Sequence, residues 1–324
     1  MGLFSLLVLV ATGSFGYVRD FDTGGPLGPW TEWVVASRGG LDVALAFAAF
    51  RAFGMSDRAR ARPDLVLLAV LVILQFGEGL LHGSKVQYIL PRLLVVVFIY
   101  ALFHHRMPIK WVLVFVIATA LSVPVTEQFR VISSQSSAER NAAALVVGAA
   151  SETVQDIDGS TAMALDTLNR RARQIENVAV ILRDTPSVFS HTNGNALPNA
   201  LAIALVPRVL WADKPIFDGG RSFPQLYLKQ ATNSRSNTGP SHIGDLYRNF
   251  GLVGVILGMG LFGAIFAALG RLTDRGGVRT LFIVAFTVAA LTRVEDSLAE
   301  GIVAFARIMP PVFLAALLIP RRDP

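Results

Sequence analysis

The chain has no cysteine among its 324 residues, and only 16% of its residues carry a charged side chain. The absence of cysteine excludes a disulfide framework, a thiolate metal site and a cysteine nucleophile. Soluble domains carry roughly 25% charged residues, so the low charge argues against an ordinary cytosolic enzyme. Hydrophobic residues instead make up 53% of the chain and are gathered in long runs. This composition is typical of a protein that lies in a lipid bilayer.

Eight apolar runs predict membrane-spanning helices, because crossing roughly 30 Å of hydrocarbon takes about 20 helical residues. The runs lie at 1–18, 34–53, 65–81, 86–103, 110–126, 251–270, 279–293 and 301–320. The second run contains Arg38, Asp42 and Arg51, so an interfacial amphipathic helix is the alternative there. No basic residue precedes the first run, so a membrane span is favoured over a signal peptide.

The distribution of basic residues predicts how these helices are oriented. With the amino terminus inside, every cytoplasmic connection contains arginine or lysine, as in Arg58, Arg60 and Arg62. The outer connections carry acidic residues such as Glu295 and Asp296. This asymmetry follows the positive-inside rule, and it accounts for the net charge of +6 without a nucleic-acid partner. Both termini are therefore predicted to be cytoplasmic.

We thus predict an all-α polytopic membrane protein with about eight transmembrane helices and one large extracytoplasmic loop that contains amphipathic helices. Its three parts are N-terminal membrane helices in 1–126, the extracytoplasmic loop in 127–250 and C-terminal membrane helices in 251–324. Within the loop, Ala196 to Leu210 is apolar but interrupted by two prolines, which predicts a buried or half-inserted segment that does not span.

An apolar repeat at helical spacing in the same loop predicts one amphipathic helix that lies on the membrane surface. The repeat consists of Leu165, Leu168, Ala172, Ile175, Val178 and Leu182.

Several ionisable residues fall inside the predicted spans, where each costs roughly 2.5 to 3.5 kcal/mol at mid-depth unless it is paired or hydrated. Those in the outer halves are Arg38, Asp42, Glu78, Arg92, Arg293 and Arg307. Together they indicate a polar cavity open toward the outer leaflet, and structural ion pairs are the alternative. Such a cavity suits an anionic lipid head group, because guanidinium groups match phosphate oxygens.

Familiar catalytic motifs give no support for other enzyme classes. Gly258, Gly260 and Gly263 have the spacing of a dinucleotide fingerprint, but they lie within an apolar span and no strand precedes them. No His-Glu-x-x-His, Walker loop or Gly-x-Ser-x-Gly string occurs. We therefore expect neither a metal nor another cofactor.

Three sequence elements carry the most specific pattern. They are Gly83-Ser-Lys85, Val206-Pro-Arg-Val-Leu-Trp-Ala-Asp-Lys-Pro215 and Ser241-His-Ile-Gly-Asp-Leu-Tyr-Arg-Asn-Phe-Gly251. Between Gly83 and Gly254 the chain resembles the bacterial oligosaccharide repeat-unit (O-antigen type) polymerases of the Wzy type. That family shares a Pro-Arg-x-x-Trp-x-x-Lys-Pro element and a later acidic-x-Tyr-x-Asn-Phe-Gly element. Its members usually have more spans before the first element, so we expect a shortened or truncated member.

The resemblance implies a glycosyltransferase of the bacterial cytoplasmic (inner) membrane that acts at the outer face. It would move glycan from undecaprenyl pyrophosphate to a sugar hydroxyl of an incoming repeat unit, building O-antigen, capsule or exopolysaccharide. The implied partners are the lipid-linked oligosaccharide, membrane lipids and other polysaccharide assembly proteins. A glycan ligase, a transporter or flippase of lipid-linked glycan and a non-catalytic scaffold are the alternatives.

The resemblance also implies phosphate ligands. Arg208 and Lys214 lie in the matching second element and are the leading ligands of the pyrophosphate. Arg92 and Arg307 rank after them, because only their depth in the membrane supports them. Arg208 could instead pair with Asp213, and Lys214 could extend toward the membrane surface.

The third element supplies the remaining predicted roles. Asp245 matches its acidic position and is predicted to be the general base, with His242 as the competing residue. Tyr247 is predicted to position sugar, and Trp211 is either a sugar platform or an interfacial anchor. The alternative for Asp245 and Tyr247 is that they cap and orient the predicted span at 251–270, since the first turn of a helix favours an acidic residue.

Overall fold

The computed structural model describes residues 31–54, 58–81, 85–104, 109–135, 142–172, 174–206, 210–211, 222–230 and 238–318. These residues form helices, turns and loops and contain no strand, so the prediction of an all-α protein is confirmed for the described chain. The predicted span at 1–18 lies outside these residues.

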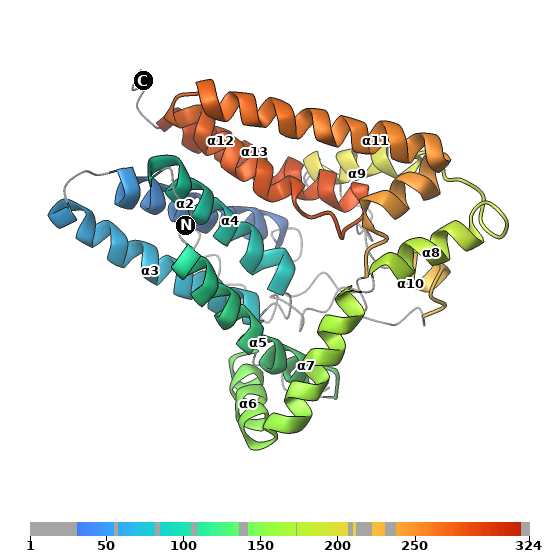
Figure 1. Ribbon diagram of the computed structural model, residues 1–324, viewed down its shortest axis with the longest axis horizontal. Helices are drawn as coiled ribbons and strands as arrows, with labels where there is room; N and C mark the ends of the chain where they lie inside the picture. Colours follow the sequence, from blue (N-terminus) through green and yellow to red (C-terminus); the bar gives the residue numbers. More distant parts are fainter. Residues whose placement is uncertain are drawn as a thin grey trace. The chain divides into compact units, whose positions relative to one another are not determined.

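The chain divides into two compact units, Met1–Leu168 and Asn169–Pro324, and the helices are labelled in Figure 1. The first unit contains α2 (Thr31–Gly54), α3 (Arg58–Leu81), α4 (Lys85–His104), α5 (Ile109–Gln135), α6 (Ala142–Gln155) and most of α7 (Ile157–Ala172). The second contains α8 (Gln174–Asp184), α9 (Ala196–Leu205), α10 (Ser222–Leu226), α11 (Ser241–Arg275), α12 (Val278–Leu291) and α13 (Leu298–Leu318).

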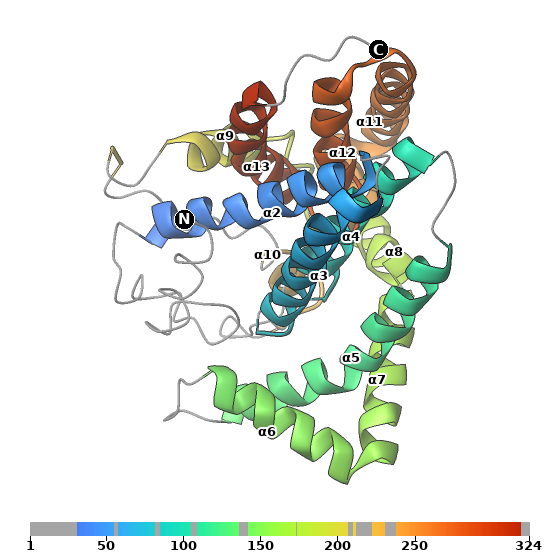
Figure 2. The same cartoon turned by 90° about the vertical axis from the view of Figure 1, so that its left-hand side faces the viewer.

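In the first unit, α2 packs against both α3 and α4, and α5 packs against α6 (Figure 1, Figure 2). Small side chains let α2 approach its neighbours closely, since Ala46 and Ala49 are fully buried. Near one end of α2, Arg51 Nε lies 3.0 Å from Asp64 Oδ1 of α3. The predicted spans at 34–53, 65–81, 86–103 and 110–126 thus each coincide with a helix, α2 to α5.

In the second unit, α11 packs against α8 and α12, and α13 packs against α9 and α12. Phe282 and Phe286 of α12 are buried, as are Val303 and Val312 of α13. The helix α9 ends at Leu205, within the apolar segment predicted not to span, and buries Ala200 against α13.

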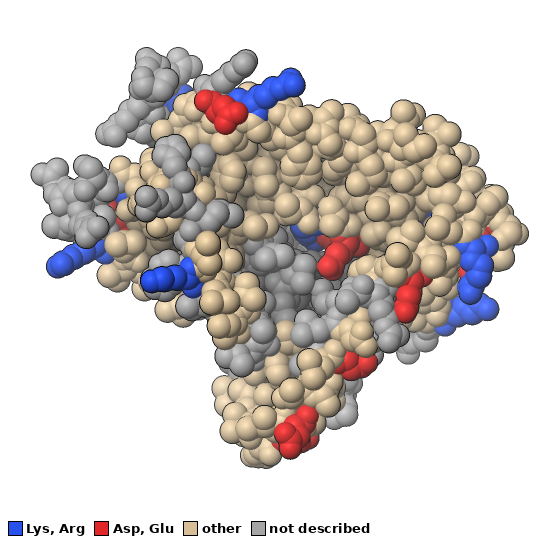
Figure 3. All heavy atoms as spheres, viewed as in Figure 1, with Lys and Arg blue, Asp and Glu red and all other residues tan. Residues whose placement is uncertain are grey.

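Two described helices are long and apolar enough to cross a membrane, Ser241–Asp274 and Leu298–Leu317, and two shorter apolar helices are Arg92–Ala101 and Val278–Leu291. Only 6% of the most apolar stretch of α11 is buried, which distinguishes it from the core helix of a soluble protein. Leu252, Val253 and Ile256 are each more than 60% exposed. Figure 3 shows this stretch of α11 as an area without charged side chains.

The predicted amphipathic repeat from Leu165 to Leu182 lies in two described helices, α7 up to Ala172 and α8 from Gln174, and Arg173 between them lies outside the described residues. The residue that α8 buries is Ile181, which does not belong to the predicted repeat, whereas Ile175 and Leu182 are 76% and 48% exposed. Hydrophobic spacing located the helix but did not identify the face that meets the protein, because α8 carries apolar residues on two faces.

Candidate functional site

The first segment of α11 ends at a kink at Gly251, whose φ of 66° favours glycine. The kink interrupts the helical hydrogen bonding of α11, and two carbonyl groups just before it accept bonds from another segment. The N–H of Thr192 donates to the carbonyl of Arg248 at 3.2 Å, and the N–H of Asn193 donates to that of Asn249 at 3.0 Å. The loop after α8 is therefore fastened to the end of this segment.

Asn249 joins the same loop to α11 through its side chain. Its Oδ1 accepts hydrogen bonds from Thr192 Oγ1 at 2.6 Å and from the N–H of Gly194 at 3.0 Å. Its Nδ2 donates to the carbonyl and to Oδ1 of Asp245, at 2.7 and 3.2 Å. Because the side chain is buried and bonded on both sides, Asn249 has a structural role in this element.

Asp245 is 1% exposed, and both of its carboxylate oxygens accept hydrogen bonds. Oδ1 accepts from Arg248 at 2.6 Å, and Oδ2 accepts from the N–H of Leu298 at 2.8 Å. Leu298 is the first residue of α13, where a carboxylate stabilises the unpaired N–H groups of a helix start. Asp245 therefore caps α13, whereas the alternative from the sequence is that it caps its own helix, α11. A role of Asp245 as the base stays a prediction.

Arg248 borders a hollow of about 270 Å³ in the second unit. The hollow is lined by Val188, Phe189, Ser190, Thr192, Leu226, Tyr227 and Arg248. The Arg248 side chain is 14% exposed, and its Nε is buried without a hydrogen-bond partner among the described residues. A buried guanidinium with an unused donor can bind an anionic oxygen, and the adjacent hydroxyl and aromatic groups suit a sugar.

The walls of the hollow are held by the core beneath it. The rings of Phe189 and Tyr227 lie 4.8 Å apart, and Tyr227 Oη is 2.8 Å from Thr185 Oγ1. Ile181 of α8 and Phe223 of α10 are fully buried against the same cluster. The ion pair with Asp245 holds Arg248, and the packed rings of Phe189 and Tyr227 form part of the wall of the hollow that Arg248 lines.

Tyr247 and His242 do not line the hollow. Tyr247 is half-buried against the core of α8 and α10, and its ring meets that of His191 edge-on at 5.9 Å. His242 is 5% exposed and packs on Phe262 at 4.9 Å. Its Nε2 is buried and has no hydrogen-bond partner in the described part of the chain, and it faces Gly301.

Arg92 lies between two carboxylates in the first unit. Its Nε donates to Asp42 Oδ1 of α2 at 2.7 Å, and its Nη1 lies 3.2 Å from Glu78 Oε2 of α3. The side chains of Arg92, Asp42 and Glu78 are 11%, 15% and 0% exposed. Two carboxylates already balance this guanidinium, so the geometry weighs against the prediction that Arg92 binds phosphate.

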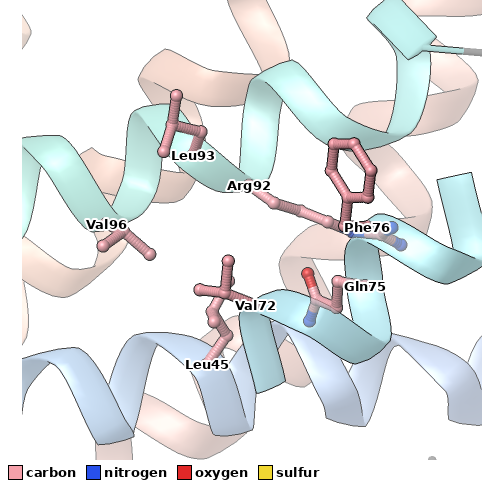
Figure 4. A pocket seen from close by; sticks show the side chains of 7 residues that line it. All are labelled: Leu45, Val72, Gln75, Phe76, Arg92, Leu93 and Val96. Atoms are coloured by element: carbon pink, nitrogen blue, oxygen red, sulfur yellow. The ribbon is translucent and has the colours of Figure 1, made fainter. Parts of the chain in front are cut away.

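A small hollow of about 20 Å³ adjoins this ion-pair network (Figure 4). Figure 4 shows Gln75 and Arg92 among apolar side chains of α2, α3 and α4. Gln75 is 3% exposed, and neither of its amide atoms has a hydrogen-bond partner among the residues that the structure describes. A space of this size accommodates about one water molecule, so it is too small for a lipid-linked sugar.

The structure tests the expected polar cavity only in part. Arg293 pairs with Asp296 as Arg248 pairs with Asp245, at 2.6 Å and three residues apart, so the alternative of a structural pair applies to both. Arg248 in addition lines the hollow of the second unit. Arg208 and Lys214 lie outside the described residues, as does the side chain of Arg307. Trp211 is half-buried.

Arg248 is the residue that the sequence analysis did not single out. It stands inside the third motif element, between Tyr247 and Asn249, at a position where the family pattern allows any residue. Its spacing of three residues from Asp245 was the available signal, because side chains at i and i+3 are neighbours on a helix.

The family described as Domain of unknown function (DUF8712) matches residues 41–278, which include both the Arg92 ion pairs and the hollow at Arg248. No curated protein and no solved structure matches the chain.

Proposed function

This chain belongs to the family described as Domain of unknown function (DUF8712), and we propose that it polymerises lipid-linked oligosaccharide repeat units. The family description assigns no activity, so the proposal is argued from the site. The observation that carries the proposal is Arg248, an arginine that is 14% exposed and lines a hollow together with hydroxyl and aromatic side chains. It stands within the sequence element that resembles the Wzy-type polymerases.

The proposed membrane arrangement is the predicted one, with eight spans, both termini in the cytoplasm and residues 127–250 outside. The long, exposed and uncharged stretch of α11 supports a span there. In this arrangement the kink at Gly251 marks the outer end of the span, and Arg248 lies just beyond it. A lipid-linked substrate on the outer face of the cytoplasmic membrane would then meet Arg248 at the membrane surface.

The reaction breaks the bond between the anomeric carbon of the growing glycan and a pyrophosphate oxygen. A bond forms between that carbon and a hydroxyl oxygen of the acceptor sugar, the hydroxyl proton goes to a base, and undecaprenyl pyrophosphate leaves. Arg248 balances the charge that develops on the departing pyrophosphate. Asp245 is a positioning residue that fixes Arg248, and Arg208 and Lys214 are proposed as further phosphate ligands.

Of the two predicted bases, we favour His242 as the proton acceptor. Nε2 of His242 has no partner among the described residues, whereas the oxygens of Asp245 accept hydrogen bonds from Arg248 and Leu298. Because Nε2 is buried away from the hollow, His242 would have to turn toward the acceptor hydroxyl to take its proton. Tyr247 and Trp211 remain proposed sugar contacts.

The test is the length of the surface glycan in cells that lack the chain and are complemented with variants. Deletion should reduce the glycan to single repeat units, and Arg248→Ala should do the same at unchanged protein level. Loss of one charge-stabilising donor typically costs roughly 100- to 1,000-fold in rate. Arg271→Ala is the matched control, because Arg271 is exposed and lies near the other end of α11.

The alternatives give different outcomes in the same cells. If the chain is a ligase, cells that lack it should keep long polymer on its lipid carrier. If it is a flippase, cells that lack it should accumulate lipid-linked repeat units on the cytoplasmic side. Normal glycan length after deletion or after Arg248→Ala would remove the polymerase proposal.

A further inference from the structure

The helix α8 exposes an apolar stripe that the core of the second unit does not use. Ile175, Ala179 and Leu182 are all exposed, and at 100° per residue they lie within about 60° of one another around the helix. Glu176 and Arg183 are exposed beside this stripe, about 70° to 90° away from its centre. One face of α8 is thus apolar and uncovered, and the next face is charged.

A third face of α8 holds the helix in place against α11. Ile181 is fully buried, and its Cδ1 lies where a side chain at Gly244 would stand, 2.7 Å from the position of such a Cβ. Gly244 belongs to the first segment of α11, before the kink at Gly251. The helix α8 is therefore attached just beyond the end of the exposed apolar stretch that begins at Leu252.

These three faces match the surroundings of a helix at a membrane surface. One side faces protein, one exposes apolar groups and one exposes charges, which is the arrangement of an interfacial helix. The neighbouring predicted span in α11 also exposes apolar side chains, since Leu252 and Val253 are 65% and 66% exposed. A water-soluble partner would not account for both surfaces at once.

We propose that α8 lies in the interface of the extracytoplasmic leaflet, with Ile175, Ala179 and Leu182 in contact with lipid, and that the hollow at Arg248 therefore sits at head-group depth. This inference rests on the proposed span in α11 and deepens the proposed function. The chain continues from α8 directly into Val188, which is 68% exposed at the hollow, and Leu226 opposite is 51% exposed. An apolar rim around a buried arginine selects an anion carried by a lipid over a soluble anion.

The experiment uses the absence of cysteine, because a single introduced cysteine will take a nitroxide label at one site only. The full chain is reconstituted in phosphatidylethanolamine–phosphatidylglycerol vesicles with labels at Ile175→Cys, Leu182→Cys and the matched control Glu176→Cys. Collision rates with oxygen, which concentrates in lipid, and with a water-soluble nickel chelate are compared. We expect an oxygen-to-nickel ratio several-fold higher at positions 175 and 182 than at position 176.

A fourth label, Ser190→Cys, reports the depth of the hollow, because Ser190 is exposed and lines it. Nickel chelated to lipid head groups should relax this label, as expected for a site at head-group depth. Equal collision ratios at 175, 182 and 176, or no relaxation of the Ser190→Cys label by head-group nickel, would overturn the inference. The helix content of each labelled variant is checked by circular dichroism, so that unfolding is not mistaken for a water-exposed helix.

The two proposals can fail separately. Collision ratios report where α8 lies, whereas glycan length reports transfer. Lipid contact of α8 with a normal glycan in Arg248→Ala would keep the interfacial helix and remove the polymerase.

Discussion

Replacing Arg92 by methionine separates a structural role from substrate binding in the first unit. The substitution keeps an unbranched side chain but removes the cation that bonds Asp42 at 2.7 Å and faces Glu78 at 3.2 Å. The carboxylates of Asp42 and Glu78 would then lose the cation that lies between them. Breaking a buried ion pair in this way typically costs about 3 to 5 kcal/mol. We therefore expect Arg92→Met to lower the free energy of unfolding by about that amount, roughly the same with and without lipid-linked substrate.

Glu78→Gln, alone and combined with Arg92→Met, tests whether the loss of stability comes from the carboxylates. Glu78→Gln leaves a one-to-one pair of Arg92 with Asp42 and retains a side-chain oxygen that can accept a hydrogen bond, so its cost should be about 1 kcal/mol. Adding Glu78→Gln to Arg92→Met removes the negative charge of Glu78 and leaves that of Asp42. The double variant should therefore be more stable than Arg92→Met alone.

The assay is thermal and denaturant unfolding of the purified chain in detergent, combined with the glycan-length assay in cells. A stable Arg92→Met protein that no longer lengthens the glycan would refute this reasoning, because it would show that Arg92 acts on substrate. A double variant no more stable than Arg92→Met would also contradict it, since the cost could not then come from uncompensated carboxylates.

Two further predictions concern the kink in α11. Gly251→Ala should destabilise the protein by about 1 to 2 kcal/mol, because φ is 66° there and L-residues avoid the left-handed region. Gly260→Ala is the control, since a Cβ there meets nothing within 4 Å, and equal unfolding curves for both variants would count against strain at the kink. Asn249→Ala removes the bonds to Thr192 Oγ1 and the Gly194 N–H, so hydrogen exchange at Gly194 should rise well above wild type while that of α13 stays slow. Unchanged exchange at Gly194 would show that the loop is held by other contacts.

The third motif element illustrates how far the pattern of residues leads. The order acidic-x-Tyr-x-Asn-Phe-Gly indicates that residues 245–251 are important. In the structure, Gly251 permits the kink, Asn249 fastens the loop, and Asp245 bonds the start of α13, 53 residues further along the chain. The pattern identified the segment, but the same residue types can serve packing or chemistry, so the pattern did not assign their roles.

The sequence by itself determined where the helices lie, because hydropathy and helix-breaking residues act over one or two turns of the chain. It also determined the apolar, uncharged stretch of α11 and the acidic and basic residues available for pairing, whereas the exposure of that stretch came from the structure. Only the tertiary structure decided that Arg92 joins residues 50 and 14 positions away, and that Arg248 lines a hollow together with the loop after α8 and the end of α10. Such pairings depend on which helix faces meet and at what angle, and those angles are set by kinks, small residues and packing between distant segments rather than by local propensity.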